Sequence, residues 1–532
     1  MTEPDAGRSA LSDGEWHRLH PLTPLLRGGL FLVVVLGFVV ANLRDRLIEI
    51  FAPWLAPGFS GPVPGDPVDY VLGHDLVLLA LGVVLLVVVA LILIFWMSWR
   101  FHTFRITGDD VEVRSGVVFR TNRRAPLDRV QGVNLTRPLV ARLLGLAKLE
   151  VVGAGLDANV RLEYLSTANA EQVRADILRL ASGRTLGESR AGGAGPATSW
   201  RSAAVQTASQ AMDSLVAGTD EPEVEPASVV RIPPGRVIGS MLLRDSTVVV
   251  LAIMIALVVW AVTGPGWLVF AILPTMIGFA TYVGRGTVRA LRYAIAPTDH
   301  GVRIVFGILT TVTEILPPGR VHAVRVHQPI LWRPAGWWTI TVNRLSGSRA
   351  GQEAAEAFTR VLPVGTREDA ERVVALLLPW LDDAERALLF DRGLLGADDD
   401  PAFTTTPRRA RILRPVSWRR DGFAVTDAAL FLRRGRFWRS LVVVPLARLQ
   451  SIALQQGPID RALRVASARA HTVAGAVDTS LGAIDLEAAR GMFEDVARRA
   501  VTAARSDRSH RWFVEDAATV RPSDRRDEEE NG

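Results

Sequence analysis

The side chains best suited to chemistry in this sequence are arginines, which gather in two places. Lysine and arginine together number 61, and Lys148 is the single lysine. A guanidinium group binds phosphate through two parallel hydrogen bonds, so clustered arginines favour contact with anionic ligands. The candidate contacts are Arg114, Arg120, Arg123, Arg124, Arg433, Arg434, Arg436 and Arg439. The alternative interpretation is a solvated basic surface without a ligand.

Motifs that define common active sites are absent from the sequence. It contains no cysteine, which excludes disulfides, thiol nucleophiles and cysteine-held zinc or iron–sulfur sites. The patterns GxxxxGK[ST], HExxH and GxSxG are also missing. We therefore expect a protein that is not an enzyme, with no catalytic residue, no cofactor and no metal site. The net charge of +6 is too modest for this length to indicate nucleic-acid binding.

Four apolar runs are candidates for crossing a membrane, which takes about 20 mostly apolar residues. A mean hydropathy of +0.22 fits a mixture of membrane helices and polar domains. The runs are 30–43, 76–99, 247–262 and 267–283. Thr263–Gly266 reads as a tight turn between the last two runs, so they should form a helical hairpin. The first two runs predict a similar hairpin.

The distribution of arginine predicts the orientation of both hairpins. Arginines flank the outer ends of each hairpin, whereas the segment 44–75 is mainly acidic and the turn 263–266 carries no charge. Positive residues remain on the cytoplasmic side of a membrane. We therefore expect a multi-pass protein of the cell membrane whose N-terminus, polar domains and C-terminus are cytoplasmic.

A motif built on glycine, proline and arginine occurs three times in the polar segments. Shifts of 191 and 319 positions bring the segment that follows Thr107 onto two later segments. The recurring residues are Gly116, Pro126, Arg129, Arg142, Gly307, Pro317, Arg320, Arg333, Gly435, Pro445, Arg448 and Arg461. Because they recur, we expect these residues to have structural roles rather than to form one unique binding site.

Each copy has the pattern of a small β-meander followed by a helix. Alternation of apolar and polar residues around 111–114 predicts a half-buried strand, and each recurring glycine should form a hairpin turn. Helical patterns close the copies at 169–180, 367–378 and 486–501. Thr366 and Asp369 resemble a capping box at the start of the second of these helices. We therefore expect three α+β barrels, each closed by a C-terminal helix.

Two segments of the first copy carry a family resemblance. Pro126–Val133 reads PLDRVQGV and Arg142–Ala147 reads RLLGLA, a pattern that resembles the bacterial PH-like domain of YdbS/YdbT-type membrane proteins. Pro445–Ile452 in the third copy is similar, whereas Pro317–Arg320 and Arg333–Trp338 in the second copy depart from the pattern. The resemblance implies PH-like domains attached to a membrane, and it implies no particular activity.

These observations predict the following order of segments. A cytosolic N-terminal segment (1–24) precedes transmembrane hairpin 1 (25–99), PH-like domain 1 (100–182) and a flexible linker (183–236). Transmembrane hairpin 2 (237–285), PH-like domain 2 (286–380), a loose connector (381–412), PH-like domain 3 (413–504) and a disordered charged tail (505–532) follow. The expected fold class is α+β, with three PH-like barrels and four transmembrane helices.

The expected function is that of a non-enzymatic scaffold or regulator. Its partners would be the lipid bilayer, anionic lipid headgroups, and another membrane protein or a second copy of itself. The alternative is a transporter or a lipid-handling component of the cell envelope. Charged residues inside the apolar runs would favour the alternative, and the four runs contain none.

Overall fold

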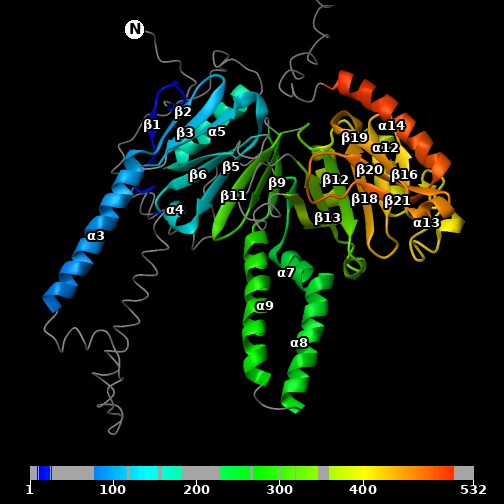
Figure 1. Ribbon diagram of the computed structural model, residues 1–532, viewed down its shortest axis with the longest axis horizontal. Coiled ribbons are helices and arrows are strands. Elements are labelled where there is room, and N and C mark those ends of the chain that lie inside the picture. Colours follow the sequence, from blue (N-terminus) through cyan, green and yellow to red (C-terminus); the bar gives the residue numbers. More distant parts are fainter. Residues whose placement is uncertain are drawn as a thin grey trace, which may run out of the picture.

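The computed structural model is an α+β structure with four antiparallel sheets (Figure 1). It describes residues 9, 11–23, 26, 77–116, 120–153, 159–181, 228–263, 268–298, 301–317, 319–344 and 359–507. The apolar run 30–43, most of the expected linker and most of the expected tail lie outside these residues.

The first copy contains two small sheets and a covering helix. Its first sheet consists of β1 (His17–Arg18), β2 (Thr103–Ile106), β3 (Asp110–Ser115) and β4 (Thr121–Pro126). Its second group of strands consists of β5 (Val130–Pro138), β6 (Leu146–Gly153) and β7 (Val160–Ser166). The short helix α4 (Leu139–Leu143) links β5 to β6, and α5 (Thr167–Ala181) closes the copy. Phe104, Val133 and Ile177 share one buried core, which joins the two sheets to α5.

The second copy repeats this order. Its strands are β8 (Val230–Arg231), β9 (Ala294–Thr298), β10 (Gly301–Phe306), β11 (Thr310–Leu316), β12 (Ala323–Gln328), β13 (Trp338–Asn343) and β14 (Arg360–Gly365). The helix α11 (Arg367–Leu377) closes the copy, and the capping box of Thr366 and Asp369 is present at its start. Between β8 and β9 the chain forms α7 (Pro234–Leu242), α8 (Asp245–Thr263) and α9 (Leu268–Ala290).

The third copy ends the described chain. Its strands are β15 (Thr404–Thr405), β16 (Gly422–Val425), β17 (Ala429–Arg434), β18 (Arg439–Pro445), β19 (Ser451–Gln455), β20 (Val465–His471) and β21 (Ser480–Asp485). The helices α13 (Pro458–Ala462) and α14 (Leu486–Ser506) occupy the places of α4 and α5. The expected connector is ordered, with α12 (Asp383–Ala387) and a π-helix (Leu388–Leu394), because Leu389 and Phe403 pack into the core.

The backbone repeats at the spacings expected from the sequence. β3, β10 and β17 each contain six residues, and β10 and β17 begin 191 and 319 positions after β3. Gly116, Gly307 and Gly435 all have positive φ, as tight hairpin turns require. Gly145 and Gly336 share a second left-handed position, and Arg464 adopts it with φ 52 in the third copy. At this position the third copy therefore keeps the backbone conformation although it has lost the glycine.

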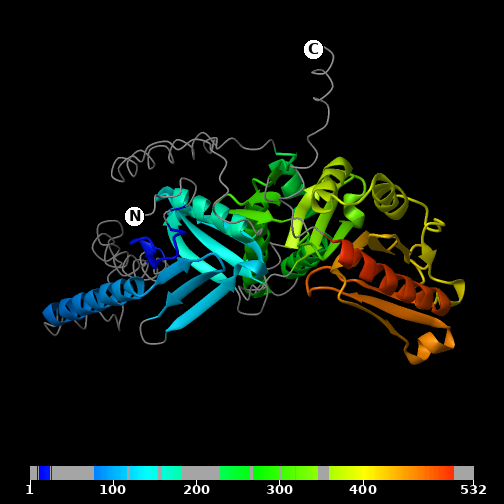
Figure 2. The same ribbon diagram turned by 90° about the horizontal axis from the view of Figure 1, so that it is seen from above.

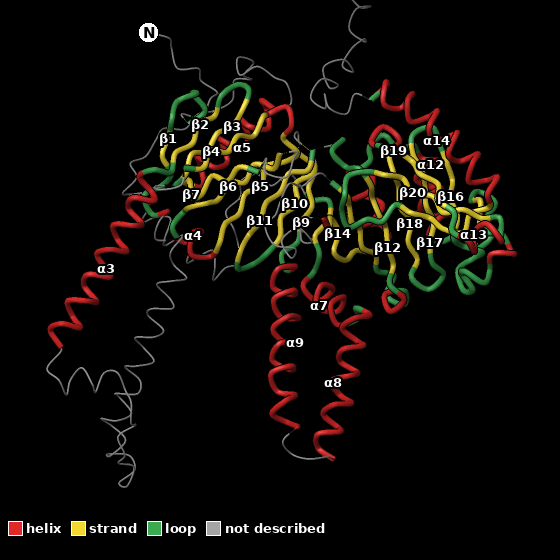
Figure 3. The backbone as a smooth tube through the Cα atoms, viewed as in Figure 1, coloured by secondary structure: helices red, strands yellow, loops and turns green. Residues whose placement is uncertain are grey.

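Neighbouring copies are joined by continuous sheets rather than closed as separate barrels, which corrects the barrel expectation. β5 of the first copy pairs with β11 of the second, and β12 of the second pairs with β18 of the third. Each junction creates a seven-stranded sheet. A strand that pairs with its neighbouring copy no longer needs to close its own barrel, because its edge N–H and C=O groups already have partners. Figure 3 shows the resulting sheets, and Figure 2 shows the copies in a row in chain order.

The apolar helices project away from the sheets on one side (Figure 1). They are α3 (Val77–Arg100), α8 and α9. Among the described helices, none is by itself long and apolar enough to cross a bilayer, whereas α7 and α8 together, bent by 60°, meet the length and composition for one crossing. The expectation of four transmembrane helices is thus not supported. The third apolar run lies in α8, which is separated from α7 by a bend at Leu243 and Arg244. α8 has 19 residues, and one of them is the charged Asp245.

Candidate functional site

A basic pocket lies where α7, α8 and α9 meet the second copy. Two adjoining cavities of about 340 Å³ and 380 Å³ share Met241, Arg244, Ala290, Arg360 and Pro363 among their lining residues. Pro234 stands at the first position of α7, where proline is favoured. The chain turns after α7 ends at Leu242, and α8 leaves at an angle of 60°. Strands β12, β13 and β14 supply the opposite wall.

Basic side chains dominate the lining of this pocket. Its charged side chains are Arg244, Arg285, Arg325, Arg360 and Asp245, and the imidazole of His327 also lines it. The described residues offer no carboxylate within ion-pair distance of Arg244 or Arg285. Asp245 is the single acid of the lining, and its Oδ2 accepts a hydrogen bond from Nε1 of Trp438. The pocket therefore has an excess of positive charge that is suited to an anion.

Burial and mutual repulsion perturb the basic groups in the inner part of the pocket. Burial lowers the pKa of Arg325, and the charges of Arg434 and Arg360 lower it further. Burial also lowers the pKa of His327 to about 4, with a second contribution from Arg325. His327 is thus neutral at pH 7, and its Nδ1 lies 3.1 Å from the carbonyl oxygen of Arg439. An anion placed here would relieve the repulsion among the arginines.

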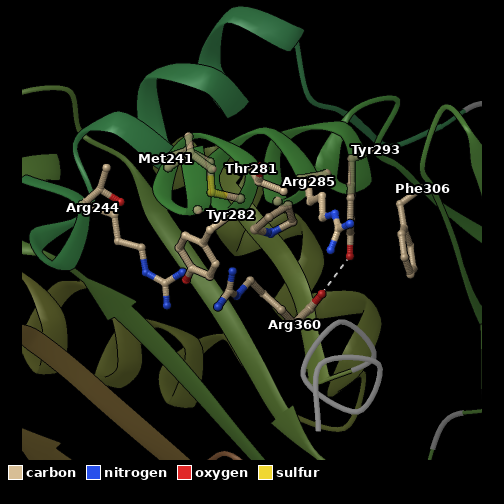
Figure 4. Close-up of a pocket in the computed structure, with 14 residues that line it drawn as sticks. Met241, Arg244, Thr281, Tyr282, Arg285, Tyr293, Phe306 and Arg360 are labelled. Carbon is tan, nitrogen blue, oxygen red and sulfur yellow. Dashed lines mark hydrogen bonds between the residues drawn. The ribbon is translucent and has the colours of Figure 1, made fainter. Parts of the chain in front are cut away.

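Three aromatic side chains, Tyr282 of α9, Tyr293 and Phe306 of β10, contribute to the lining (Figure 4). The hydroxyl of Tyr293 donates to the carbonyl oxygen of Arg360 at 2.8 Å, and its ring stacks on Phe306 with centroids 5.6 Å apart. Burial raises the pKa of Tyr293 well above its usual range, so it remains a neutral donor. Tyr282 is exposed on α9 at the mouth of the pocket. The site therefore combines cationic groups with an apolar rim.

The arginines proposed from the first copy do not enter this pocket. The guanidinium of Arg114 lies 3.9 Å from the ring centroid of Trp16. Arg124 forms ion pairs with Asp110 and Glu112 on the neighbouring strand β3. Arg120 and Arg123 are exposed and have no ion-pair partner among the described residues. These four side chains lie around the β3–β4 hairpin, at the free edge of the first sheet.

The arginines proposed from the third copy have four different environments. Arg433 is fully buried, with 0% exposure, and donates to the carbonyl oxygens of Arg420 and Asp398, so the structure contradicts its proposed contact with a ligand. Arg434 pairs with Asp478 at 3.0 Å. Arg436 is exposed and lies 3.3 Å from Asp398. Arg439 is half-buried and approaches the pocket through its carbonyl oxygen.

The recurring residues have mainly structural contacts. The three glycines form the left-handed turns described above, and Pro126 and Pro445 precede short 3₁₀ turns that lead into β5 and β19. Pro317 follows β11 directly. Arg448 pairs with Asp507 at 2.7 Å, whereas Arg129 is exposed and Arg320 is half-buried.

The second recurring arginine connects neighbouring copies. Arg142 donates to Oγ1 of Thr311 in the second copy at 3.3 Å. Arg333 donates to the carbonyl oxygen of Arg436 in the third copy. Arg461, at the same place in the third copy, is exposed, and its guanidinium has no hydrogen-bond partner among the described residues.

The sequence did not identify the pocket because its residues come from distant segments. Arg244 and Arg285 flank apolar runs, so they were interpreted as markers of membrane orientation. Arg325 alternates with Val324 and Val326 along a strand, which resembles an ordinary solvent-facing residue. The sequence carried one signal of the pocket. Arginines occur in the two segments on either side of one hairpin, 231–244 and 285–292, and again in the later segment 320–333.

Comparison with known proteins supports the repeated organisation. The family model described as "Bacterial PH domain" matches three times, at residues 61–181, 238–379 and 357–500. A curated relative, the UPF0699 transmembrane protein YdbT of Bacillus subtilis (strain 168), is 30% identical over 103 residues. That alignment spans 19% of this chain and 20% of the relative. No solved structure matches. Because the family matches together cover well over half of its residues, the chain belongs to the bacterial PH domain family.

Proposed function

We propose that this chain is a non-enzymatic protein of the cell membrane whose basic pocket binds the phosphate of an anionic lipid headgroup. The observation that carries the proposal is that Arg244, Arg285, Arg325 and Arg360 line two adjoining cavities, whose described lining includes one acidic residue, Asp245. No catalytic step is needed, because the pocket offers binding groups alone. The protein would act as a scaffold or regulator that responds to the lipid composition.

Exposed apolar side chains on the projecting helices support the membrane attachment. Val249, Ile253 and Val259 of α8 are each more than half exposed. Water-soluble surfaces rarely carry apolar patches of this extent, so these helices fit a lipid environment. α7 has a buried side that includes Val237 and an exposed side that includes Leu242, as a helix at the membrane interface would have.

The pocket lies at the depth where phosphates would be found if α8 and α9 enter the bilayer. Arg244 and Arg285 stand at the two helix ends that face the sheets, and Arg325 and Arg360 extend the cavity toward the second copy. By the positive-inside rule, the sheets would then lie on the cytoplasmic side. A charge-assisted hydrogen bond contributes about 1.5–3 kcal/mol, so loss of one weakens binding about tenfold or more.

The proposal is tested with the full chain in detergent micelles. A fluorescent short-chain phosphatidylglycerol is titrated by anisotropy and competed with unlabelled phosphatidylglycerol, phosphatidylcholine or inorganic phosphate. We expect phosphatidylglycerol to compete at least tenfold better than phosphatidylcholine. The variant Arg244→Gln/Arg285→Gln should bind at least tenfold more weakly than the native chain, because it removes two of the four guanidinium groups.

A matched control separates the pocket from general positive charge. Arg490→Gln/Arg498→Gln removes the same charge from exposed positions on α14 and should bind like the native chain. Arg120→Gln/Arg123→Gln tests the basic hairpin of the first copy. Normal binding by the pocket variant, or loss of binding in the hairpin variant alone, would refute the proposed site. Full competition by inorganic phosphate at the concentration that suffices for phosphatidylglycerol would identify a phosphate site rather than a lipid site.

A further inference from the structure

The two junctions between copies have the same geometry. Val133 of β5 faces Ile315 of β11, and the equivalent Val324 of β12 faces Val443 of β18. The remaining pairs follow the same register, so one strand-pairing rule relates the first copy to the second and the second to the third. The cores are continuous across these junctions, since Ile315 belongs to the core of the first copy.

The recurring arginine strengthens each junction from the side. Arg142 reaches Thr311 across the first junction, and Arg333 reaches the carbonyl oxygen of Arg436 across the second. Both acceptors lie in or beside the hairpin turn of the following copy. Arg461 occupies the same position in the third copy, and the described residues contain no further copy for it to reach.

In the described residues, each of the two strands that form a junction therefore has one counterpart without a partner strand, β4 in the first copy and β19 in the third. β4 is equivalent to β11 and β18, yet it is the edge of its sheet, and Thr121–Arg124 are exposed. β19 is equivalent to β5 and β12, yet it is also an edge, and its five residues are exposed or half-buried. The equivalent residues of β11 and β18 are mostly buried. The edge strand β4 is therefore equivalent to the strands that pair with β5 and β12, and the edge strand β19 is equivalent to β5 and β12 themselves.

We propose that two copies of this chain associate head to tail, with β19 of one molecule pairing with β4 of the next. The repeated register predicts the facing residues: Ile452 opposite Arg124, Ala453 opposite Arg123, and Leu454 opposite Asn122. No pair brings like charges together, and Arg124 is already neutralised by Asp110 and Glu112. Arg461 of the first molecule would reach the β3–β4 hairpin of the second.

The association is compatible with one membrane. α3 and the α8–α9 pair project from the same side of the sheets, so repetition of the internal relation leaves the helices of each added molecule on that side (Figure 1). A head-to-tail contact of this kind adds further molecules or closes into a ring. The exposed β4 residues are more polar than their equivalents Val312 and Ile315, so this junction should be weaker than the internal ones and reversible.

Cysteine cross-linking tests the proposal directly, because the native chain contains no cysteine. Full chains that carry Arg123→Cys or Ala453→Cys are produced together in one membrane, oxidised and separated on a non-reducing gel. We expect a disulfide-linked dimer from the mixture and no dimer from either variant alone. A chain with both substitutions should give a ladder of dimers, trimers and larger species. Facing Cα atoms in a β-sheet are about 4.5–5.5 Å apart, which permits a disulfide.

Control variants check the register and the folding. Asn122→Cys mixed with Ala453→Cys should give little product, because a shift of one residue points the side chains to opposite faces. Thr136→Cys/Val312→Cys within one chain should form an internal disulfide at the first junction and thereby confirm the native fold. Arg461→Gln should lower the dimer yield severalfold, whereas Arg490→Gln should not.

Two results would overturn the proposal. The first is the absence of dimer from the mixed variants, together with a purely monomeric native chain in light scattering over a wide range of concentrations. The second is efficient dimer formation by Arg123→Cys alone, which would show a symmetric β4–β4 contact instead. Neither result depends on lipid binding, so the outcome is independent of the pocket proposed above.

Discussion

Replacement of Arg433 by glutamine should destabilise the third copy strongly. This guanidinium is fully buried and donates to the carbonyl oxygens of Arg420 at 2.8 Å, Ala397 at 3.1 Å and Asp398 at 2.8 Å. Its charged carbon also lies 4.4 Å from the ring centroid of Phe403. Together these contacts fix the segment that follows the π-helix against β17.

The magnitude follows from what the substitution leaves behind. A glutamine amide is too short to reach all three carbonyl groups, so at least two of these acceptors, one buried and two partly buried, lose their donor at about 1–3 kcal/mol each. We expect a total loss of about 3–5 kcal/mol in the free energy of unfolding, as is typical when one partner of a buried polar network is removed. The matched control is Arg436→Gln, which removes an exposed arginine beside Asp398 and should cost less than about 1 kcal/mol.

The assay is thermal and urea-induced unfolding of the full chain in detergent, combined with limited proteolysis. Arg433→Gln should lower the unfolding midpoint and expose new cleavage sites between 388 and 403, whereas Arg436→Gln should do neither. An unchanged midpoint together with unchanged proteolysis in Arg433→Gln would refute the reasoning. Equal destabilisation by both variants would show that the charge, rather than the buried hydrogen bonds, is responsible.

Two further substitutions test particular features of the fold. Burial lowers the pKa of His327 to about 4, so the unfolded chain binds more protons than the folded chain between pH 6.5 and 4. The free energy of unfolding should therefore fall by at most about 3 kcal/mol as the pH is lowered through that window. His327→Gln should remove this part of the pH dependence in urea unfolding at pH 7 and 4.5, whereas the exposed control His471→Gln should not, and an unchanged slope in His327→Gln would contradict the assignment. Gly435→Ala should cost about 1–3 kcal/mol, since Gly435 has φ +74 and an added Cβ would collide with the carbonyl oxygen of Trp438. Gly491→Ala on α14 has open space and should instead raise the thermal midpoint, so equal effects of the two glycine variants would argue against the turn geometry.

The candidate site could be predicted only in its chemistry. The clustered arginines of the first and third copies indicated a basic surface, whereas the arginines that line the pocket lie on α9, β12 and β14 and between α7 and α8. Segments so distant in sequence meet only after the sheets form. Arg433 was expected to be exposed because it lies in an arginine-rich hairpin. Its side chain is instead buried and donates to the carbonyl oxygen of Asp398 in the connector.

The sequence by itself determined the three copies, their spacing and the local conformation of each. Glycines at positive φ, prolines before short turns and the Thr366 capping box act through neighbouring residues, so their effects are visible in a linear pattern. Only the tertiary structure decided that the copies share sheets instead of forming closed barrels. An edge strand satisfies its backbone groups equally well with its own copy or with the next one, and that choice depends on how whole copies pack.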